Sequence, residues 1–394
     1  MIGGFAWEPL GTIRHRTFPL ASALAMHGHD VRIFLPPYDN LRYSGQTFLR
    51  EGVTVVNTAA YRSRAGLPLM LISLLRLVTK FRPDIVHVFK PKGFSGAAGM
   101  ILRVLGVPII LDCDDWEGWG GWNDVMPYPR LVKDFIDFQE RWLIRHAAAV
   151  TVASHALEGR ALEVGAKGPV VLVPNCGASA SQVPLQHEVA ALDRADERGG
   201  FGIAVDRKVI FYAGHFEPAD DLGFLCRVCA HVARRTGALL LFAGTGPRLA
   251  EVQAFMAEQG IEAKYLPPAS YRDFLRAISI SDVTVFPYPD DPLHRSKCSA
   301  RIIDYMAMGK PVVTTAVGMN LEYIVDGESG VLVPADNEER FESELELLLD
   351  DPNRCTILGS QARHRIRTTF RWDGRPLTAC LEIYDSVGKS REDA

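Results

Sequence analysis

Residues 301–314 read Arg301-Ile302-Ile303-Asp304-Tyr305-Met306-Ala307-Met308-Gly309-Lys310-Pro311-Val312-Val313-Thr314. They predict a short helix that ends at Gly309, because glycine readily adopts the left-handed conformation that closes a helix. Pro311 cannot continue the helix, and the β-branched residues after it favour a buried strand. In a parallel α/β sheet, ligands bind beyond the carboxyl ends of the strands and against helix N-termini, whose N–H groups attract phosphate. Asp304, early in this helix, is therefore a candidate for a hydrogen bond to a ribose.

Apolar runs recur along the chain and alternate with segments long enough for helices. The runs are residues 31–35, 53–56, 85–89, 107–111, 149–153 and 170–173 in the first half, and 209–213, 239–243, 283–286, 312–315 and 330–333 in the second. This alternation predicts the α/β class, with parallel sheets that carry helices on both faces. Residues 177–207 lack a sustained apolar period and are rich in small and charged residues. We therefore expect an N-terminal domain at 1–180, a linker at 181–207 and a C-terminal domain at 208–370.

The first strand is predicted to be very short. Only Met1 and Ile2 precede the pair Gly3-Gly4, whereas a doubly wound domain normally opens with a full strand. Either the sequence begins late or the sheet accepts a stub. The helix expected next has apolar residues at helical spacing, namely Phe18, Leu20, Ala21, Leu24 and Ala25.

Composition narrows the class of protein. The chain has 394 residues, 47% hydrophobic and 23% charged, with a formal net charge of -4, which suits a globular protein of two domains. Nothing requires a strongly basic face, so nucleic acid is not an expected partner. The seven cysteines are scattered, and Cys226 and Cys229 lack a second pair that would complete a zinc site. We expect no metal, no secretory signal and a cytoplasmic location.

The longest apolar stretch, residues 67–78, is interrupted by Arg76 and is shorter than the roughly 20 residues of a membrane span. Two interpretations remain open for it. It is a helix packed on the sheet, or it lies on an anionic membrane surface as an amphipathic helix. The second interpretation draws on the basic residues that flank the stretch, which are Arg62, Arg64, Lys80 and Arg82.

The segment from Asp304 to Val313 resembles the donor-binding helix of retaining glycosyltransferases with the GT-B fold, in particular glycosyltransferase family 4. That family's helix reads Glu-Ala/Tyr-Met-Ala-x-Gly-x-Pro-Val-Val, with Asp304 here in the place of the glutamate. The resemblance continues in Gly28-His29-Asp30-Val31 and in Phe370-Arg371-Trp372. It implies two Rossmann-like doubly wound domains facing a central cleft, and a C-terminal helix at 371–394 that returns to the first domain.

The resemblance also implies an activity. It is the transfer of a sugar, with retention, from a nucleotide-diphosphate sugar to a glycan, a lipid-linked compound or a small molecule. The nucleotide sugar is a co-substrate, and neither a further cofactor nor an obligatory metal is implied. The leaving diphosphate helps to deprotonate the acceptor, so the protein mainly positions the reactants and stabilises negative charge.

Two glycine-containing loops are expected near the donor. Gly11-Thr12, before the first helix, resembles the family's loop that approaches the diphosphate and the acceptor. Arg14, His15 and Arg16 follow it, and basic residues at a helix start oppose the helix dipole unless an anion binds there. A solvated surface cluster is the alternative, and an acceptor contact is assigned to Arg14. Gly244-Thr245-Gly246-Pro247 resembles the family's Gly-x-Gly-Pro, a turn that brings backbone close to a ligand or to neighbouring loops.

The donor loops also depart from the family. The family has an arginine directly after the glycine matched by Gly214 and a lysine further on, where this chain has His215 and Asp220. An aspartate beside a diphosphate is unfavourable because like charges repel strongly in a poorly solvated cleft. The family's glutamate that touches the donor sugar, eight positions before Asp304, is replaced by Ser296. We still assign Gly214, His215 and Ser296 to the donor site.

Compensation is expected at the start of the helix. Lys297, Ser299 and Arg301 offer two cations and a hydroxyl that can bind phosphate oxygens. Arg301 is the first choice for a replacement phosphate clamp. A surface salt bridge from Arg301 to Asp304 or Asp282 is an equally good interpretation of the same residue.

Acceptor groups are expected at the end of the strand at 107–111, where Asp112-Cys113-Asp114-Asp115-Trp116-Glu117 follows. We assign catalysis to Asp114 and Asp115, because a carboxylate there can orient an acceptor hydroxyl or accept its proton. Trp116 and Trp119 can stack on sugar rings or hold a lipid, or they pack the loop as a lid. His87 and Lys90, after a neighbouring strand, are candidates for an acceptor phosphate.

Two alternative functions remain. One is a GT-B-fold enzyme that is not a transferase, such as a sugar-nucleotide epimerase. The other is a catalytically silent binding protein, which the replaced glutamate, arginine and lysine favour.

Overall fold

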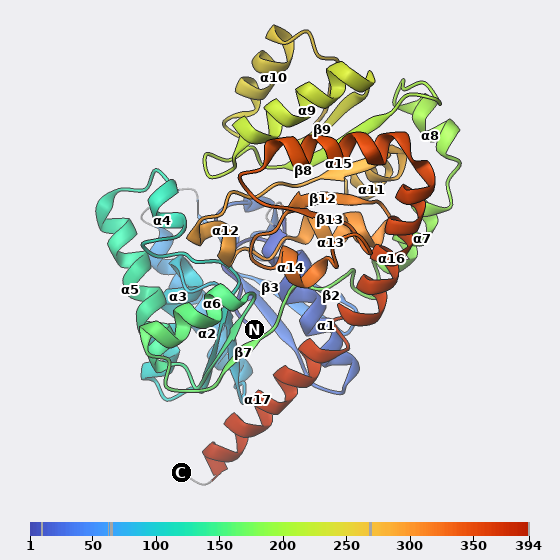
Figure 1. Cartoon of the computed structure of the whole chain (residues 1–394). Helices are drawn as coiled ribbons and strands as arrows, with labels where there is room; N and C mark the ends of the chain where they lie inside the picture. Colours follow the sequence, from blue (N-terminus) through green and yellow to red (C-terminus); the bar gives the residue numbers. More distant parts are fainter. Residues whose placement is uncertain (9–10, 62, 64–65, 268–269, 393–394) are drawn as a thin grey trace. The chain divides into compact units, whose positions relative to one another are not determined.

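The computed structural model describes residues 1–8, 11–61, 63, 66–267 and 270–392, and it divides into two compact units (Figure 1). Unit 1 comprises Met1–Ser179, Arg295–Cys298 and Arg371–Ala394. Unit 2 comprises Ala180–His294 and Ser299–Phe370. Among the described residues, no helix combines the length and the apolar character that crossing a bilayer requires.

The sheet of unit 1 is completed by Ile2. One part has the order β2-β3-β1 and the other the order β4-β5-β6-β7, and Ile2 forms parallel bridges to Phe34 and Val88 between them. The N–H of Ile2 donates to His87 O (2.9 Å), and the N–H of Phe89 donates to Ile2 O (2.8 Å). The sheet therefore accepts the short first strand. The strands are β1 (Arg32–Leu35), β2 (Thr47–Arg50), β3 (Val53–Asn57), β4 (Val86–Phe89), β5 (Ile109–Cys113), β6 (Ala149–Val152) and β7 (Val170–Leu172).

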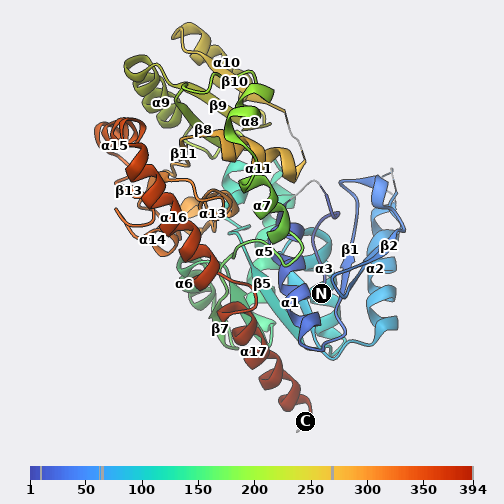
Figure 2. The same cartoon turned by 90° about the vertical axis from the view of Figure 1, so that its right-hand side faces the viewer.

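Helices cover both faces of this sheet. They are η1 (Ile13–Thr17), α1 (Phe18–Met26), η2 (Leu41–Tyr43), α2 (Leu67–Phe81), α3 (Gly93–Val104), α4 (Trp122–Val125), α5 (Arg130–His146), α6 (His155–Val164) and α17 (Arg375–Glu392). Figure 2 shows α2 and α3 side by side, and both α2 and α5 contact α3. Helix α1 is buried continuously from Phe18 to Leu24, because it packs on β1 and β3 and also contacts α17. It is therefore enclosed on all sides and does not have a single apolar face.

Unit 2 has a fully parallel sheet with the order β10-β9-β8-β11-β12-β13. Relative to its first strand, β8, this is the doubly wound order 3-2-1-4-5-6, whose switch point lies between β8 and β11. The strands are β8 (Val209–Gly214), β9 (Leu239–Gly244), β10 (Ala263–Leu266), β11 (Val283–Val285), β12 (Val312–Thr315) and β13 (Val331–Val333). The helices are α7 (Val183–Ala190), α8 (Arg194–Gly200), α9 (Leu222–Thr236), α10 (Leu249–Glu258), α11 (Tyr271–Ile280), α12 (Pro292–Ser296), α13 (Ala300–Ala307), α14 (Asn320–Tyr323), α15 (Glu338–Asp350) and α16 (Pro352–Thr369).

The eleven apolar runs all form strands, and the sequence missed two others. Strands β2 and β10 lie at sheet edges and are half-exposed or exposed, so neither shows a sustained apolar run. Strand β2 also pairs antiparallel with β3, against the expectation of purely parallel sheets. Residues 181–207, interpreted as a linker, contain α7 and α8, and the side chain of Arg198 is buried against the carbonyls of Ile280, Val205 and Arg207.

The helix and the strand expected within residues 301–314 are both formed, as α13 and β12. Helix α13 is capped by Ser299, whose hydroxyl accepts a hydrogen bond from the N–H of Ile302 (3.4 Å). Gly309 follows with φ +70°, in the left-handed region. Its carbonyl packs directly on α16, because a Cβ built on Gly359 would lie 2.0 Å from Gly309 O. The turn and α16 therefore touch backbone to backbone.

This contact predicts that Gly359→Ala destabilises the protein by about 1–3 kcal/mol, since the added methyl forces the backbones apart. Gly159→Ala in α6 is the matched control, because a Cβ there meets nothing within 4 Å. It should be neutral or stabilise by roughly 0.5–1 kcal/mol. Thermal and urea unfolding measure both changes, and equal effects of the two substitutions would contradict the packing argument.

Candidate functional site

The donor residues of unit 2 gather at the carboxyl edge of its sheet. Gly214 ends β8 and pairs in register with Gly244, which ends β9. Gly244 has φ +128°, and a Cβ there would lie 2.0 Å from Gly214 O. A Cβ on Gly246 would lie 1.5 Å from His215 O. These glycines therefore let two neighbouring loops pack backbone against backbone beside the switch point.

The loop after β8 is shaped by its own residues. His215 is exposed, whereas the next residue, Phe216, is fully buried with φ +45°. The carboxylate of Asp220 accepts a hydrogen bond from the N–H of Glu217 (3.1 Å). The carbonyl of Asp220 accepts one from Nη1 of Arg248 (3.2 Å), whose Nε contacts Glu251 (2.9 Å). Asp220 thus closes the turn, and Arg248, which lies directly before α10 and contacts this loop, is a cation that the sequence interpretation missed.

Arg301 does not form the surface salt bridge offered as its alternative. Its guanidinium carbon lies 5.0 Å from the ring centroid of Phe274, and among the described residues it joins no ion pair. Asp282 instead binds Arg194 (2.5 Å) and Arg198 (2.8 Å). Arg301 is half-buried at the start of α13 with its hydrogen-bond donors uncommitted to a carboxylate.

Asp304 and Tyr305 connect α13 to the sheet. Asp304 is buried, and its Oδ1 accepts a hydrogen bond from the hydroxyl of Tyr271 (2.8 Å). The hydroxyl of Tyr305 accepts one from the N–H of Ala213 (2.8 Å), directly before the end of β8. The geometry therefore fixes the start of α13 beside the loop that follows β8, within unit 2.

The predicted donor residues are divided between the two units. Gly214, His215, Gly244, Ser299, Arg301 and Asp304 belong to unit 2, and Gly11, Thr12, Ser296 and Lys297 belong to unit 1. Gly11 and Thr12 lie directly before η1. The carbonyl of Ser296 accepts a hydrogen bond from the hydroxyl of Ser154 (2.8 Å), and Nζ of Lys297 lies 5.0 Å from the ring centroid of Trp122.

In unit 1, the basic residues after Thr12 have separate roles. Arg16 is buried and forms a bidentate ion pair with Asp112. The distance from Nε to Oδ1 is 2.6 Å and that from Nη2 to Oδ2 is 2.7 Å. Its Nη1 also donates to the carbonyl of Val173 (2.7 Å). Burial lowers the pKa of Arg16, but the charge and hydrogen bonds of Asp112 raise it more, so the guanidinium stays charged. Arg16 is therefore structural, whereas Arg14 remains accessible and lies 3.5 Å from Glu8.

His87 is enclosed in the same network and is not presented to a ligand. Thr151 donates its hydroxyl to Asp112 (2.6 Å), so it accepts from Nε2 of His87 (3.0 Å). Nδ1 of His87 then accepts from the hydroxyl of Tyr384 (2.8 Å), on α17. Burial is the largest of the effects that lower the pKa of His87, which keeps the ring neutral. The expectation of an acceptor phosphate at His87 is therefore corrected.

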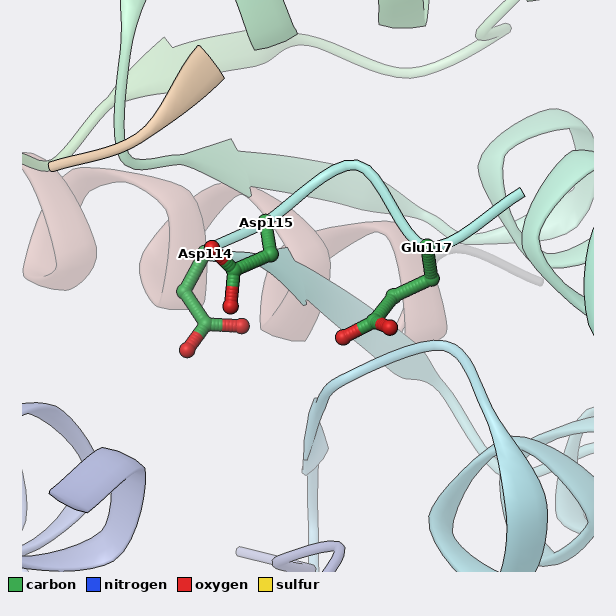
Figure 3. A group of neighbouring side chains, drawn as sticks. All are labelled: Asp114, Asp115 and Glu117. Carbon is green, nitrogen blue, oxygen red and sulfur yellow. The ribbon is translucent and has the colours of Figure 1, made fainter. Parts of the chain in front are cut away.

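The loop after β5 carries three carboxylates whose side chains point to the same side of it (Figure 3). Nζ of Lys90 lies 3.1 Å from Asp114, 2.5 Å from Asp115 and 3.0 Å from Glu117. Burial lowers the pKa of Lys90, but the three carboxylates raise it more. The ammonium thus occupies the position between the carboxylates that a metal ion would need. Lys90 is buried and its ammonium is engaged by these carboxylates, which corrects its assignment to an acceptor phosphate.

The carboxylates differ in their access to solvent. The side chain of Asp115 is 24% exposed, that of Asp114 9% and that of Glu117 1%. Burial raises the pKa of Glu117, but Lys90 and Lys92 lower it more, to about 2. Burial is also the first of the causes that raise the pKa of Asp115. Asp115 is therefore the carboxylate best suited to meet an acceptor hydroxyl.

The tryptophans hold this loop in place. The ring of Trp116 faces the guanidinium of Arg160 at 4.7 Å and fills the space left by Gly120 and Gly121. Trp119 donates from its indole nitrogen to Asp134 on α5 (3.1 Å). These contacts match the interpretation of a packed lid for Trp116, while Trp119 keeps a partly exposed ring.

Glu140 on α5 is a supporting residue that the sequence interpretation missed. It accepts hydrogen bonds from the N–H groups of Glu117 (2.9 Å) and Gly118 (3.3 Å). Burial raises the pKa of Glu140 to about 7. A lone glutamate in an amphipathic helix gives no sequence signal for this role, because its partners lie 23 and 22 residues away.

Two doubly wound units, the second with the 3-2-1-4-5-6 order and a helix N-terminus at its carboxyl edge, define a GT-B type of protein. Solved structures agree with this fold. A sucrose-phosphate synthase from Thermosynechococcus elongatus has a TM-score of 0.74 at 19% identity, with 99% of each chain covered. A protein from Anabaena in complex with UDP-glucose has a TM-score of 0.66 at 14% identity, with 100% of this chain and 99% of that chain covered.

The chain belongs to the group 1 glycosyltransferases, glycosyltransferase family 4. Residues 11–176 match the family described as "Glycosyl transferase 4-like domain", and residues 193–365 match "Glycosyl transferases group 1". A D-inositol 3-phosphate glycosyltransferase from Saccharomonospora viridis is 30% identical over 204 residues, 48% of this chain and 46% of the relative. The chain thus spans about half the length of the curated relatives it matches.

The ion pair between Arg16 and Asp112 predicts a large effect of breaking it. Arg16→Met should destabilise the protein by about 3–5 kcal/mol, because it leaves the buried Asp112 carboxylate without a charged partner. Arg14→Met is the control and should change stability by less than about 1 kcal/mol, since Arg14 is partly exposed and lies 3.5 Å from the partly exposed Glu8. Urea unfolding measures both variants, and a change of similar size in the two would contradict a structural role of the buried pair.

Proposed function

We propose that the protein is a glycosyltransferase that moves a sugar from a nucleotide-diphosphate sugar to an acceptor, with retention. The observation that carries the proposal is the start of α13 at the carboxyl edge of unit 2. There the half-buried guanidinium of Arg301 has no carboxylate partner among the described residues, beside the loop after Gly214. The family of the chain supports this use of the edge, as does the Anabaena neighbour in complex with UDP-glucose.

In this proposal unit 2 binds the donor. Arg301 contacts the diphosphate, assisted by the first turn of α13, and Asp304 with Tyr271 holds the ribose. The close-packed backbones at Gly214 and Gly244 keep the adjoining loops in position. The protein acts by orienting the donor and stabilising the charge that develops on the leaving diphosphate.

Unit 1 supplies the acceptor groups in the same proposal. Asp115 orients the acceptor hydroxyl, with Asp114 beside it, and Trp119 offers a partly exposed ring for a sugar or a lipid. In this proposal no metal is involved, because the ammonium groups of Lys90 and Lys92 already offset two of the three carboxylate charges. The acceptor is a glycan or a lipid-linked compound, and a contact of α2 with a membrane surface belongs to the proposal. No disulfide joins any of the seven cysteines, all of which lie in the described part of the chain, and this suits the reducing cytoplasm.

The donor site is tested by a thermal-shift and calorimetry screen of nucleotide sugars. A donor should stabilise the parent, and Arg301→Ala should weaken its binding by about tenfold to a hundredfold, the value of a charge-assisted hydrogen bond. Arg272→Ala is the control, because Arg272 is an exposed arginine of unit 2 paired with Glu188. Equal stabilisation of the parent and Arg301→Ala would place the donor elsewhere.

The same screen separates the alternative functions. A binding protein without catalysis is favoured by the replacements at His215 and Asp220, and it would bind a nucleotide sugar without hydrolysing or transferring it. An epimerase would interconvert the free nucleotide sugar with no acceptor present, which NMR detects. Transfer of the sugar to an added acceptor would exclude both.

The carboxylate assignment predicts that Asp115→Asn lowers the rate of transfer by about 10²–10⁴-fold, the usual contribution of a positioned acid or base. Donor affinity should stay at the parent value, because Asp115 lies in unit 1. Transfer kinetics and donor calorimetry on the same preparation check the two parts. An unchanged transfer rate would remove Asp115 from the catalytic role.

A further inference from the structure

Exposed apolar side chains concentrate on three neighbouring helices of unit 1. Of the 21 large hydrophobic residues exposed in the described part of the chain, ten lie on α2, α3 and α5 or directly after them. Helix α3 contacts both α2 and α5, so the three helices form one layer on the sheet. We call this layer the apolar face. Its exposed members are Leu67, Leu69, Ile72, Ile101, Val104, Leu105, Leu131, Val132, Phe135 and Phe138.

The buried side of each helix shows that these residues point away from the sheet. On α2 the buried positions include Met70 and Leu74, while Leu69 and Ile72 are 52% and 43% exposed. Helix α2 therefore packs on the sheet, as one interpretation of residues 67–78 expects, and it also presents apolar side chains to the outside. Arg62 and Arg64, which flank this stretch, lie outside the described residues.

Helix α5 adds the largest groups of the apolar face. Ile136 and Leu143 are buried, whereas Leu131, Phe135 and Phe138 are 83%, 50% and 51% exposed. The spacing of four and three residues places these three side chains on one stripe of the helix. Two exposed phenylalanines on one helix are unfavourable in water, so the stripe indicates an apolar partner.

The charge of the apolar face indicates which partner it is. The three helices carry seven Lys or Arg residues and three Asp or Glu residues, in a chain whose formal net charge is -4. The three acids are engaged, since Asp134 pairs with Arg130 (3.1 Å), Asp137 accepts from the N–H of Trp119 (3.1 Å) and Glu140 is buried. A basic surface with protruding apolar groups fits an anionic lipid bilayer.

A recess at the side of α5 supports the same partner. It has a volume of about 380 Å³ and is lined by Trp119, Phe138, Trp142, Arg141, Arg145 and His146, together with Asp134 and Asp137, which accept hydrogen bonds from Trp119. Tryptophan rings prefer the interface between headgroups and acyl chains, and arginine binds phosphate. The recess thus offers the contacts that the headgroup region of a membrane supplies.

The apolar face also lies near the acceptor groups of unit 1. Helices α2 and α5 are crossovers between parallel strands, so their first halves lie at the carboxyl edge of the sheet. Loop 114–121 is bonded to the first half of α5 through Trp119 and Asp134 (3.1 Å). Leu67 and Leu69 on α2, and Leu131 to Phe138 on α5, are therefore at the edge that carries Asp115.

We infer that the apolar face docks on an anionic membrane surface, with Leu131, Phe135 and Phe138 of α5 inserted between the headgroups. This deepens the membrane contact of the proposed function by extending it from α2 to α5. It rests on that function only for the idea that the acceptor is lipid-linked. Docking then brings a lipid-linked acceptor to the edge where Asp115 lies.

Vesicle sedimentation of the full chain tests the inference. Vesicles of phosphatidylcholine are compared with vesicles in which about one third of the lipid is phosphatidylglycerol. The parent should bind the anionic vesicles, and added salt should weaken this binding. Phe135→Ser/Phe138→Ser should reduce it by about tenfold or more, because two apolar anchors are lost. Leu347→Ser/Ile357→Ser, at exposed sites of α15 and α16 in unit 2, is the matched control and should bind as the parent does.

Three outcomes would overturn the docking. They are no binding of the parent to anionic vesicles, equal loss in the two double variants, and a parent that is a dimer in solution while Phe135→Ser/Phe138→Ser is a monomer. The last outcome would identify a second copy of the chain as the partner. Calorimetry of donor binding on the same proteins keeps the proposed function separate. A protein that binds a nucleotide sugar but no vesicle refutes the docking alone, and one that binds vesicles but no nucleotide sugar refutes the function alone.

Discussion

The buried ion pair between Arg16 and Asp112 joins most of unit 1. Arg16 comes from η1, Asp112 from β5, and Nη1 of Arg16 reaches the end of β7 at Val173 O (2.7 Å). Through Thr151 the pair continues to His87 and then to Tyr384 of α17. One charged contact thus fixes the glycine-containing N-terminal loop, the strand that carries the acceptor carboxylates and the C-terminal helix. The cost of burying both ions is offset by this number of hydrogen bonds.

A second buried cation, Lys90, offsets part of the negative charge of the carboxylates in the loop after β5. Without it, three carboxylates whose oxygens lie within 4.8 Å of one another would repel each other, and part of them would take up protons. With Lys90 and Lys92 present, Glu117 stays ionised and binds both ammonium groups. Asp115, the most exposed of the three, lies at the rim of the loop, where a base or an orienting group has to lie.

The sequence predicted the fold well and the site only in part, for physical reasons. Apolar runs in a sequence indicate strands whose residues are buried. The prediction therefore missed only the edge strands β2, which is mostly exposed, and β10, which is half-exposed. The turn at Gly309 was predictable because its signals are local. The partners of Arg16, His87 and Lys90 were not, because they lie 96, 64 and 25 residues away. The sequence alone does not show whether a Lys or Arg side chain binds a ligand or forms an ion pair within the protein. The fold shows which of the two applies.

At the carboxyl edge of the unit 2 sheet, Arg301 can replace the arginine and the lysine with which the family binds the donor phosphates. Asp220 does not occupy the loop after β8 as a free charge, since its carboxylate closes a turn on Glu217 N (3.1 Å). Arg301 approaches from the other side of the switch point, on α13, and keeps its guanidinium against the ring of Phe274. At about 4 Å and an effective dielectric constant near 20, the attraction between one such charge and a phosphate is roughly 4 kcal/mol. Desolvation of both ions reduces this to the net effect of about tenfold to a hundredfold in affinity expected for Arg301. That is enough to hold one phosphate group, so the remaining negative charge of a diphosphate depends on the N–H groups in the first turn of α13.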